Sequence, residues 1–181
     1  GTISFDVRKD IGVGSTPYNI DVGDLDKDGK TDIVVSNYSS ATVSILRNIS
    51  NIGTISFTVA TSLVGLSNIR GIAIGDFDGD TNPDIAVNDY GNGRVAFFLN
   101  TNSSIGTISF PTTASLIFAT GGNPYDNLTI GDFDGDGKID VATANQNGVN
   151  TLLVLKNTSN SIGNLSFLSR VPYATGTNPY N

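Results

Sequence analysis

The segments GDLDKDGKTDIVVSN (residues 23–37), GDFDGDTNPDIAVND (residues 75–89) and GDFDGDGKIDVATAN (residues 131–145) are three versions of one motif, spaced 52 and 56 residues apart. A second motif, GTISF, occurs at residues 1–5, 53–57 and 106–110 and returns as GNLSF at residues 163–167. Two motifs that recur with one period indicate tandem repeats. We therefore divide the 181 residues into an outer strand of a preceding unit (1–16), three repeats (17–63, 64–117 and 118–172) and the start of a fourth repeat (173–181).

Each repeat is predicted to contain four short strands, because β-branched and aromatic stretches alternate with clusters of Gly, Asn, Asp and Ser. The second and third strands are almost continuous apolar runs, which indicates that they are covered on both faces. The sequence therefore predicts an all-β protein of four-stranded antiparallel sheets stacked face to face. The expected strands contain Tyr18–Val22, Ile33–Val35, Val43–Leu46 and Ile55–Phe57 in the first repeat; Ile72–Ile74, Ile85–Val87, Val95–Leu99 and Ile108–Phe110 in the second; and Leu128–Ile130, Val141, Leu152–Leu155 and Leu165–Phe167 in the third.

The chain is acidic, with a formal net charge of −7, and its 17 acidic residues are all Asp. Twelve of them lie in the three recurrent loops, so three bound divalent cations would bring the net charge to about −1. The ten Lys and Arg residues are scattered, so nucleic acid is not an expected partner. The absence of Cys excludes disulfides and thiolate metal sites. No apolar run approaches the roughly 20 residues of a membrane span.

The three loops place carboxylates at positions one, three, five and nine, which suits Ca²⁺ because this ion takes about six to eight oxygen ligands. Position seven is expected to supply a backbone carbonyl, and a Gly at position six permits a positive φ angle. The middle loop has Thr81 in place of that Gly, so its site is expected to be the weakest, although Pro83 stiffens the loop. The predicted calcium ligands are Asp24, Asp26, Asp28, Lys30 and Asp32; Asp76, Asp78, Asp80, Asn82 and Asp84; and Asp132, Asp134, Asp136, Lys138 and Asp140.

Other Asp-rich calcium loops fit the sequence less well. An EF-hand needs a bidentate acid at position twelve, where this chain has Val35, Val87 and Thr143. Thrombospondin-type calcium repeats rely on cysteines, and the glycine-rich nonapeptide of calcium β-rolls does not occur. A single loop of this kind is equally consistent with an acidic solvated turn, but three copies in register favour metal binding.

The pattern D-x-D-x-D-G-x-x-D at residues 24–32 and 132–140, the repeat length and the strand pattern together resemble the FG-GAP or VCBS-type repeat. This repeat is the blade of the integrin α-subunit β-propeller and of many bacterial surface proteins. The resemblance spans the whole chain and implies tandem four-stranded β-propeller-type blades with calcium at the turn between a blade's first two strands. About three blades are expected, which do not close a ring by themselves because this family usually builds seven.

We do not expect the protein to be an enzyme. A loop that offers four carboxylates and a carbonyl leaves little room for a substrate or an activated water. The chain also lacks His and Cys, which are the common general base and the stronger nucleophile. The remaining acids form no recognisable catalytic set: Asp6, Asp10, Asp21, Asp89 and Asp126.

Glycan binding by a lectin-like propeller is the alternative function, and an accessory domain of a secreted enzyme is a more distant one. The tyrosines that such binding could use are Tyr18, Tyr125 and Tyr180 in recurrent P-Y segments and Tyr38, Tyr90 and Tyr173 elsewhere, but packing at the blade edge is the favoured interpretation. The recurrent Asn48, Asn100 and Asn157 are interpreted as turn-capping residues. N-x-S/T sequons permit glycosylation without demonstrating it, at Asn37, Asn48, Asn102, Asn127, Asn157 and Asn164.

An open array of three blades leaves apolar faces and strand edges exposed, which favours association. Because the sequence begins in mid-blade, we expect either a piece of a longer protein or an assembly of several chains into a ring or filament. The predicted function is an extracellular or cell-surface, calcium-stabilised structural or adhesive module, the building block of a surface filament or larger propeller. Calcium, further repeats or copies of the same chain, and glycans or surface proteins are the expected partners.

Overall fold

The computed structural model describes residues 7–146, 150–168, 171–176 and 179. It contains three four-stranded sheets with the strand orders β1-β2-β3-β4, β5-β6-β7-β8 and β9-β10-β11-β12, and all neighbouring strands are antiparallel. The strands are β1 (Pro17–Gly23), β2 (Asp32–Asn37), β3 (Thr42–Asn48) and β4 (Phe57–Leu63); β5 (Ile72–Gly75), β6 (Asp84–Asp89), β7 (Arg94–Phe98) and β8 (Leu116–Ala119); and β9 (Asn123–Gly131), β10 (Asp140–Gln146), β11 (Thr151–Leu155) and β12 (Val171–Ala174). A short 3₁₀ helix, η1 (Tyr90–Asn92), follows β6.

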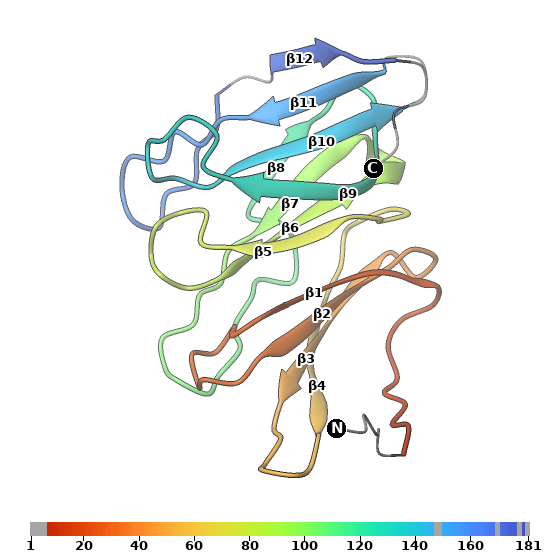
Figure 1. Ribbon diagram of the computed structural model, residues 1–181, viewed down its shortest axis with the longest axis vertical. Helices are drawn as coiled ribbons and strands as arrows, with labels where there is room; N and C mark the ends of the chain where they lie inside the picture. Colours follow the sequence, from red (N-terminus) through yellow and green to blue (C-terminus); the bar gives the residue numbers. More distant parts are fainter. Residues whose placement is uncertain (1–6, 147–149, 169–170, 177–178, 180–181) are drawn as a thin grey trace, which may run out of the picture.

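The three sheets are stacked along the long axis of the molecule (Figure 1). Each sheet is formed by consecutive strands, so every repeat is one blade, and in the described part of the chain the blades do not close into a ring. The connections that follow β1, β5 and β9 lie along the same side of the stack (Figure 1). The predicted all-β fold of tandem propeller-like blades is confirmed.

The hydrophobic core consists of two layers, one between each pair of neighbouring sheets. The middle sheet contributes to both layers, and all six residues of its strand β6 are buried. The first layer contains Leu25, Val34, Val43, Ile45, Leu63, Ile69, Ile72, Ile85, Val87, Ala96 and Phe98. The second contains Ala73, Phe77, Ala86, Val95, Phe97, Leu128, Val141, Leu153, Leu155 and Phe167.

The first three strands of each repeat lie where the sequence predicts them, but the predicted position of the fourth strand is wrong in the second and third repeats. The outer strands are β8 and β12, which follow the GTISF and GNLSF segments instead of containing them. These segments bend inward, so that Ile108 and Phe110 pack on the first core layer and Leu165 and Phe167 on the second. Their apolar alternation therefore marks a segment that closes the edge of the core, and in the first repeat only Phe57 of the motif belongs to β4.

The ends of the chain leave two sequence predictions open. Residues 7–16 form no strand, and residues 1–6 lie outside the described part, so the outer strand expected at 1–16 stays a prediction. β12 includes Tyr173, and four residues of the expected fourth repeat are outside the described part. Among the described residues, no helix has the length and apolarity that a membrane span requires.

A polar cluster joins the three sheets at the start of their first strands. The Arg70 guanidinium lies near four tyrosine rings, with distances from its Cζ to the ring centroids of 5.3 Å for Tyr18, 5.5 Å for Tyr38, 4.3 Å for Tyr90 and 3.7 Å for Tyr125. Arg70 Nη1 also lies 3.6 Å from Asp126 Oδ1, which accepts a 2.6 Å hydrogen bond from the Tyr18 hydroxyl. The cluster contains charged or hydroxyl groups from all three repeats.

A bulge in β9 places Asp126 in this cluster. The pairing of β9 with β10 shifts between Leu128, opposite Thr143, and Tyr125, opposite Ala144. Asp126 therefore has no partner in β10, and it adopts a φ of 51°, a left-handed conformation that Asp tolerates better than most residues.

We predict that Arg70→Met lowers the free energy of unfolding by about 2 kcal/mol, because it removes a partly buried charge from four aromatic faces and from Asp126. Urea unfolding followed by circular dichroism measures the change. The control is Arg8→Met, since Arg8 pairs with Asp10 on the surface with side chains 84% and 73% exposed, and its loss should cost under about 0.5 kcal/mol. Equal losses for the two variants would contradict a stabilising role of the cluster.

Candidate metal centres

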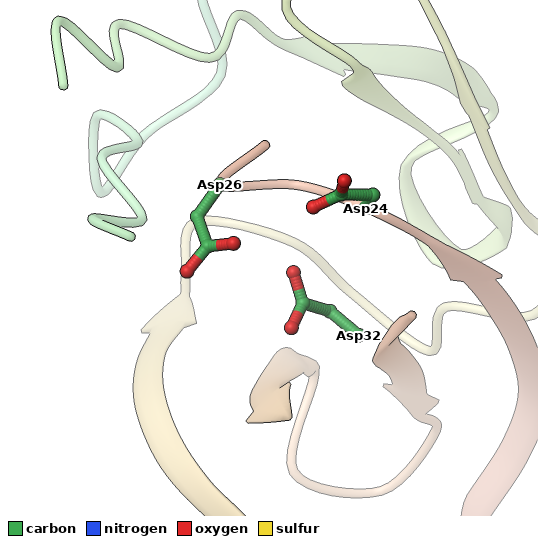
Figure 2. A group of neighbouring side chains, drawn as sticks. All are labelled: Asp24, Asp26 and Asp32. Carbon is green, nitrogen blue, oxygen red and sulfur yellow. The ribbon is translucent and has the colours of Figure 1, made fainter. Parts of the chain in front are cut away.

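The three acidic loops each bring three carboxylates together between the first two strands of a sheet. Within each set, one oxygen per residue lies within 4.8 Å of the others. Figure 2 shows the first set, in which the carboxylates from the beginning and the end of the loop point toward one another. The sets are Asp24, Asp26 and Asp32; Asp76, Asp78 and Asp84; and Asp132, Asp134 and Asp136.

The remaining predicted ligands lie in the same loops but outside these sets. Asp28 Oδ1 accepts the backbone N–H of Lys30 at 3.0 Å, and Asp80 Oδ1 accepts that of Asn82 at 2.7 Å. The Lys30 and Lys138 side chains lie 3.8 Å and 3.6 Å from the Asp carboxylates at position five of their own loops. The backbone carbonyls of Lys30, Asn82 and Lys138 stay predicted ligands.

The position-nine aspartates connect each loop to the end of the third strand. Asp84 is fully buried; its Oδ1 accepts the N–H of Asn100 at 2.8 Å and its Oδ2 accepts the N–H of Phe77 at 3.0 Å. Asp32 and Asp140 make the equivalent pairs of bonds at 2.8 and 2.9 Å. The same bonds hold Asp140 in place, although it does not belong to the third carboxylate set.

The position-one aspartates hold the turn itself. Asp24 accepts the N–H groups of Asp28 and Gly29 at 3.1 and 2.9 Å, and Asp132 accepts that of Gly137 at 2.8 Å. Asp76 accepts the N–H groups of Gly79 and Thr81 at 2.8 and 2.9 Å. The loops are therefore already folded around their carboxylates, which lowers the entropic cost of binding an ion.

Burial raises the cost of negative charge in the first two loops. Desolvation raises the pKa of the Asp84 carboxyl from 3.8 to about 7, and it also raises the pKa values of Asp32 and Asp78. In the exposed third loop, backbone hydrogen bonds lower the pKa of Asp132, and the bond from the N–H of Gly137 has the largest effect. Clustered, desolvated carboxylates with only oxygen donors fit a hard divalent cation such as Ca²⁺, which would neutralise them.

Two basic side chains, which the sequence analysis did not identify, contact the first and third loops. Arg47 in β3 forms ion pairs with Asp26 and, at 3.1 Å, with Asp28. Lys156, which follows β11, forms ion pairs with Asp134 and, at 3.3 Å, with Asp136. The equivalent residue of the second repeat is Leu99, so the middle loop has no basic side chain from this position. Both cations precede the recurrent Asn, which is the signal that could have identified them.

Thr81 adopts the left-handed conformation that the loop requires, with a φ of 73°. For a β-branched residue this conformation is strained. The strain is present in the metal-free loop, so it lowers the stability of the fold rather than the affinity of the folded loop for an ion. Displacement of Arg47 or Lys156, in contrast, opposes binding directly. The predicted weakness of the middle site stays a prediction, and Leu99 acts in the opposite direction because no ion pair has to be displaced there.

The recurrent asparagines do more than cap turns, because two of them connect neighbouring repeats. Asn100 Nδ2 donates to the carbonyl of Pro83 in its own repeat at 3.0 Å and to that of Leu25 in the preceding repeat at 2.9 Å. Asn157 Nδ2 does the same with Ile139 at 3.1 Å and Phe77 at 2.7 Å. Leu25 and Phe77 lie inside the first and second acidic loops, so each of these two loops is fastened to the next blade.

Four of the candidate glycan-binding tyrosines pack around Arg70, in agreement with the packing interpretation, whereas Tyr180 lies outside the described residues. The sequons differ in accessibility. Asn37 and Asn157 are buried with their amides hydrogen-bonded, while Asn164 is exposed. Of these three asparagines, only Asn164 is accessible to a glycosylating enzyme on the folded chain.

Comparison with known proteins identifies a family model, the FG-GAP-like repeat, which matches residues 24–87 and 82–143. The first match begins at the start of the first acidic loop, the second begins inside the middle loop, and both end in the second strand of the next repeat. No curated protein matches the chain.

We predict that Arg47→Leu raises the calcium affinity of the first loop about tenfold, because binding no longer displaces an ion pair. Isothermal titration calorimetry measures this change in a chain whose other loops are disabled by Asp76→Ala and Asp132→Ala. The reciprocal variant, Leu99→Arg in a chain with only the middle loop intact, should weaken binding, and Arg8→Leu should leave it unchanged. Unaltered affinity in Arg47→Leu would show that the guanidinium does not compete with the ion.

The raised pKa of Asp84 predicts how the stability of the metal-free chain depends on pH. Between about pH 4 and 7 the folded chain holds a proton that the unfolded chain has lost, so the free energy of unfolding falls as the pH rises. Saturating calcium should abolish this fall, because the ion stabilises the ionised carboxylate. Urea unfolding in chelator at several pH values measures it, with Asp84→Asn as the comparison. Parallel pH profiles for the two proteins would contradict the assignment.

Proposed function

Because the chain belongs to the FG-GAP-like repeat family, we propose that it is an extracellular, calcium-stabilised structural or adhesive module. In this role it is a building block of a surface filament or of a larger propeller. Calcium occupies the three acidic loops and stiffens the blades. The chain does not catalyse a reaction.

The position of the acidic loops carries this proposal. The first and second carboxylate sets surround Leu25 and Phe77, whose carbonyls accept hydrogen bonds from the next blade. An ion that fixes the loop would therefore also fix the contact between neighbouring blades. This arrangement supports a mechanical function for the metal.

The surroundings of the carboxylates also favour a non-catalytic role. Asp32, Asp84 and Asp140 have both oxygens engaged by backbone N–H groups, so they are held as structural groups. Two acids outside the loops, Asp21 and Asp89, have structural partners too. Asp21 accepts the N–H of Ile74 across the interface between the first two sheets at 2.8 Å, and Asp89 is buried against Arg94 at 2.6 Å.

The expected calcium affinity is the reason for proposing an extracellular location. Sites formed by short oxygen-ligand loops on an extracellular module bind calcium with dissociation constants of roughly 10⁻⁴ to 10⁻³ M. Such sites fill where calcium is near-millimolar, which is the condition outside cells. Lectin-like binding receives less support, since four of the candidate tyrosines pack on Arg70.

We predict that removal of calcium lowers the melting temperature, because an ion that binds only the folded chain stabilises it by mass action. With calcium at about 100 times the dissociation constant, each site contributes about 2.7 kcal/mol. Scanning fluorimetry with the intrinsic tyrosines, in calcium and then in excess chelator, measures the shift. An unchanged melting temperature would refute the calcium assignment.

The same measurement on Asp24→Ala, Asp76→Ala and Asp132→Ala assigns the shift to individual loops. Each variant should lose part of the difference between calcium and chelator. Asp10→Ala is the control, because this Asp lies outside the loops with its side chain 73% exposed. A calcium shift that survives in all three loop variants would place the ion elsewhere.

A further inference from the structure

The outer face of the first sheet exposes positions that are buried in the second and third sheets. Ile20 is 60% exposed, whereas its equivalents, Ile72 and Leu128, are 2% and 3% exposed. Val22, two residues further along β1, is 54% exposed. We call this surface, formed by Ile20, Val22, Ile33, Val35 and Leu46, the entry face.

The outer face of the third sheet shows the complementary difference. Phe133 is 50% exposed, whereas its equivalents, Leu25 and Phe77, are 0% and 1% exposed. Leu152 is 37% exposed, and its equivalents, Val43 and Val95, are fully buried. We call this surface, centred on Phe133 and Leu152, the exit face.

The chain itself shows twice how an exit face meets an entry face. In the first core layer, Leu25, Val34, Val43 and Ile45 of the first sheet pack on Ile72, Ile85, Val87 and Phe98 of the second. In the second layer, Phe77 and Val95 of the second sheet pack on Leu128, Val141 and Leu155 of the third. The two outer faces present the same positions and are apolar in the same way.

The entry face also contains a hollow lined mainly by apolar side chains. Tyr18, Ile20, Ile33, Val35 and Leu46 line it together with Ile11 and Val13, and its volume is about 340 Å³. Ile33, Val35 and Leu46 are equivalent to Ile85, Val87 and Phe98, the residues of the second sheet that share a core layer with Leu25. The Phe133 side chain of another exit face is equivalent to Leu25, so the hollow is where it would pack.

Polar groups follow the same pattern. Asn100 and Asn157 each donate to one carbonyl in their own repeat and one in the preceding repeat. Within the described part of the chain, Asn48 Nδ2 donates only to the carbonyl of Thr31 in its own repeat, at 2.8 Å. The position equivalent to Leu25 and Phe77 in the exit face is Phe133, whose carbonyl is the matching acceptor.

A second pair of backbone groups repeats in the same way. The N–H of Gly106 donates to the carbonyl of Asp26 at 2.9 Å, and that of Gly163 donates to the carbonyl of Asp78 at 3.3 Å. The equivalent donor beside the entry face is Gly53, and the equivalent acceptor beside the exit face is Asp134. Both apolar and polar groups of an interface between blades are therefore present at the two ends of the stack.

We propose that the exit face of one chain docks on the entry face of a second copy, with Phe133 in the hollow and Asn48 bonded to the Phe133 carbonyl. The contact is heterologous, because different surfaces of the two copies meet. Its repetition produces a ring where the rotation closes and a filament where it does not. This docking extends the proposed function by naming the two surfaces through which copies assemble. Only its biological role rests on the proposed function.

Two face variants test this docking. Ile20→Asp places a charge in the entry face and Phe133→Asp places one in the exit face; both residues are at least half exposed, so the fold should persist, as circular dichroism verifies. Light scattering coupled to size-exclusion chromatography should find assemblies for the unaltered chain and monomers for each variant. An equimolar mixture of the two variants should form a dimer of twice the monomer mass, because each retains one intact face. Ile105→Asp is the control: Ile105 is 75% exposed in the middle of the stack, so this variant should assemble normally.

Three results would overturn the docking: a monomeric unaltered chain at all concentrations, face variants that still assemble, or a mixture of variants that stays monomeric. Calcium titration of the unaltered chain separates these outcomes from the metal assignment. An unaltered chain that binds calcium but does not assemble would refute the docking alone, whereas an unaltered chain that assembles without binding calcium would refute the calcium assignment alone. Electron microscopy of the unaltered chain distinguishes rings from filaments.

Discussion

The carboxylates of Asp32, Asp84 and Asp140 are buried at the same place in each repeat, between the acidic loop and the end of the third strand. Each accepts two backbone N–H groups, which satisfies its hydrogen bonds but does not cancel its charge. Asp32 and Asp84 also lie close to two further carboxylates of their own loops, and three carboxylates gather in the third loop. The local structure therefore concentrates negative charge where water is partly excluded, and this makes a cation the natural complement.

The three loops meet this constraint in different ways without metal. Arg47 and Lys156 supply a positive charge to the first and third loops from within the fold. The middle loop has Leu99 at that position, and it is there that burial raises the pKa of Asp84 to about 7. Calcium binding would displace an ion pair in the first and third loops but not at the Leu99 position of the middle loop. Three loops with similar ligands can therefore differ in calcium affinity.

The structural features that the sequence correctly predicted recur in every repeat. The Asp pattern, the first three strands of each blade and the face-to-face stack all recur with one period and follow from local residue types. The outer strands β8 and β12 were placed wrongly because apolar alternation in GTISF has the same form whether the segment pairs as a strand or fills the edge of the core. Arg47, Lys156 and the Arg70 cluster were missed because each depends on contacts between segments far apart in the sequence, and Asp126 reaches Arg70 only through a bulge.

Metal binding and stacking of the blades are coupled through single residues. Leu25 lies between Asp24 and Asp26; its side chain is buried against the second sheet and its carbonyl accepts the amide of Asn100. Phe77 holds the equivalent place between Asp76 and Asp78. An ion that orders the flanking carboxylates restricts the same backbone that carries the apolar contact and the hydrogen bond to the next blade. Each of the two core layers joins neighbouring blades, and each begins in an acidic loop, so the apolar packing of the stack is set interface by interface, while the Tyr18–Asp126 hydrogen bond also ties the first blade to the third.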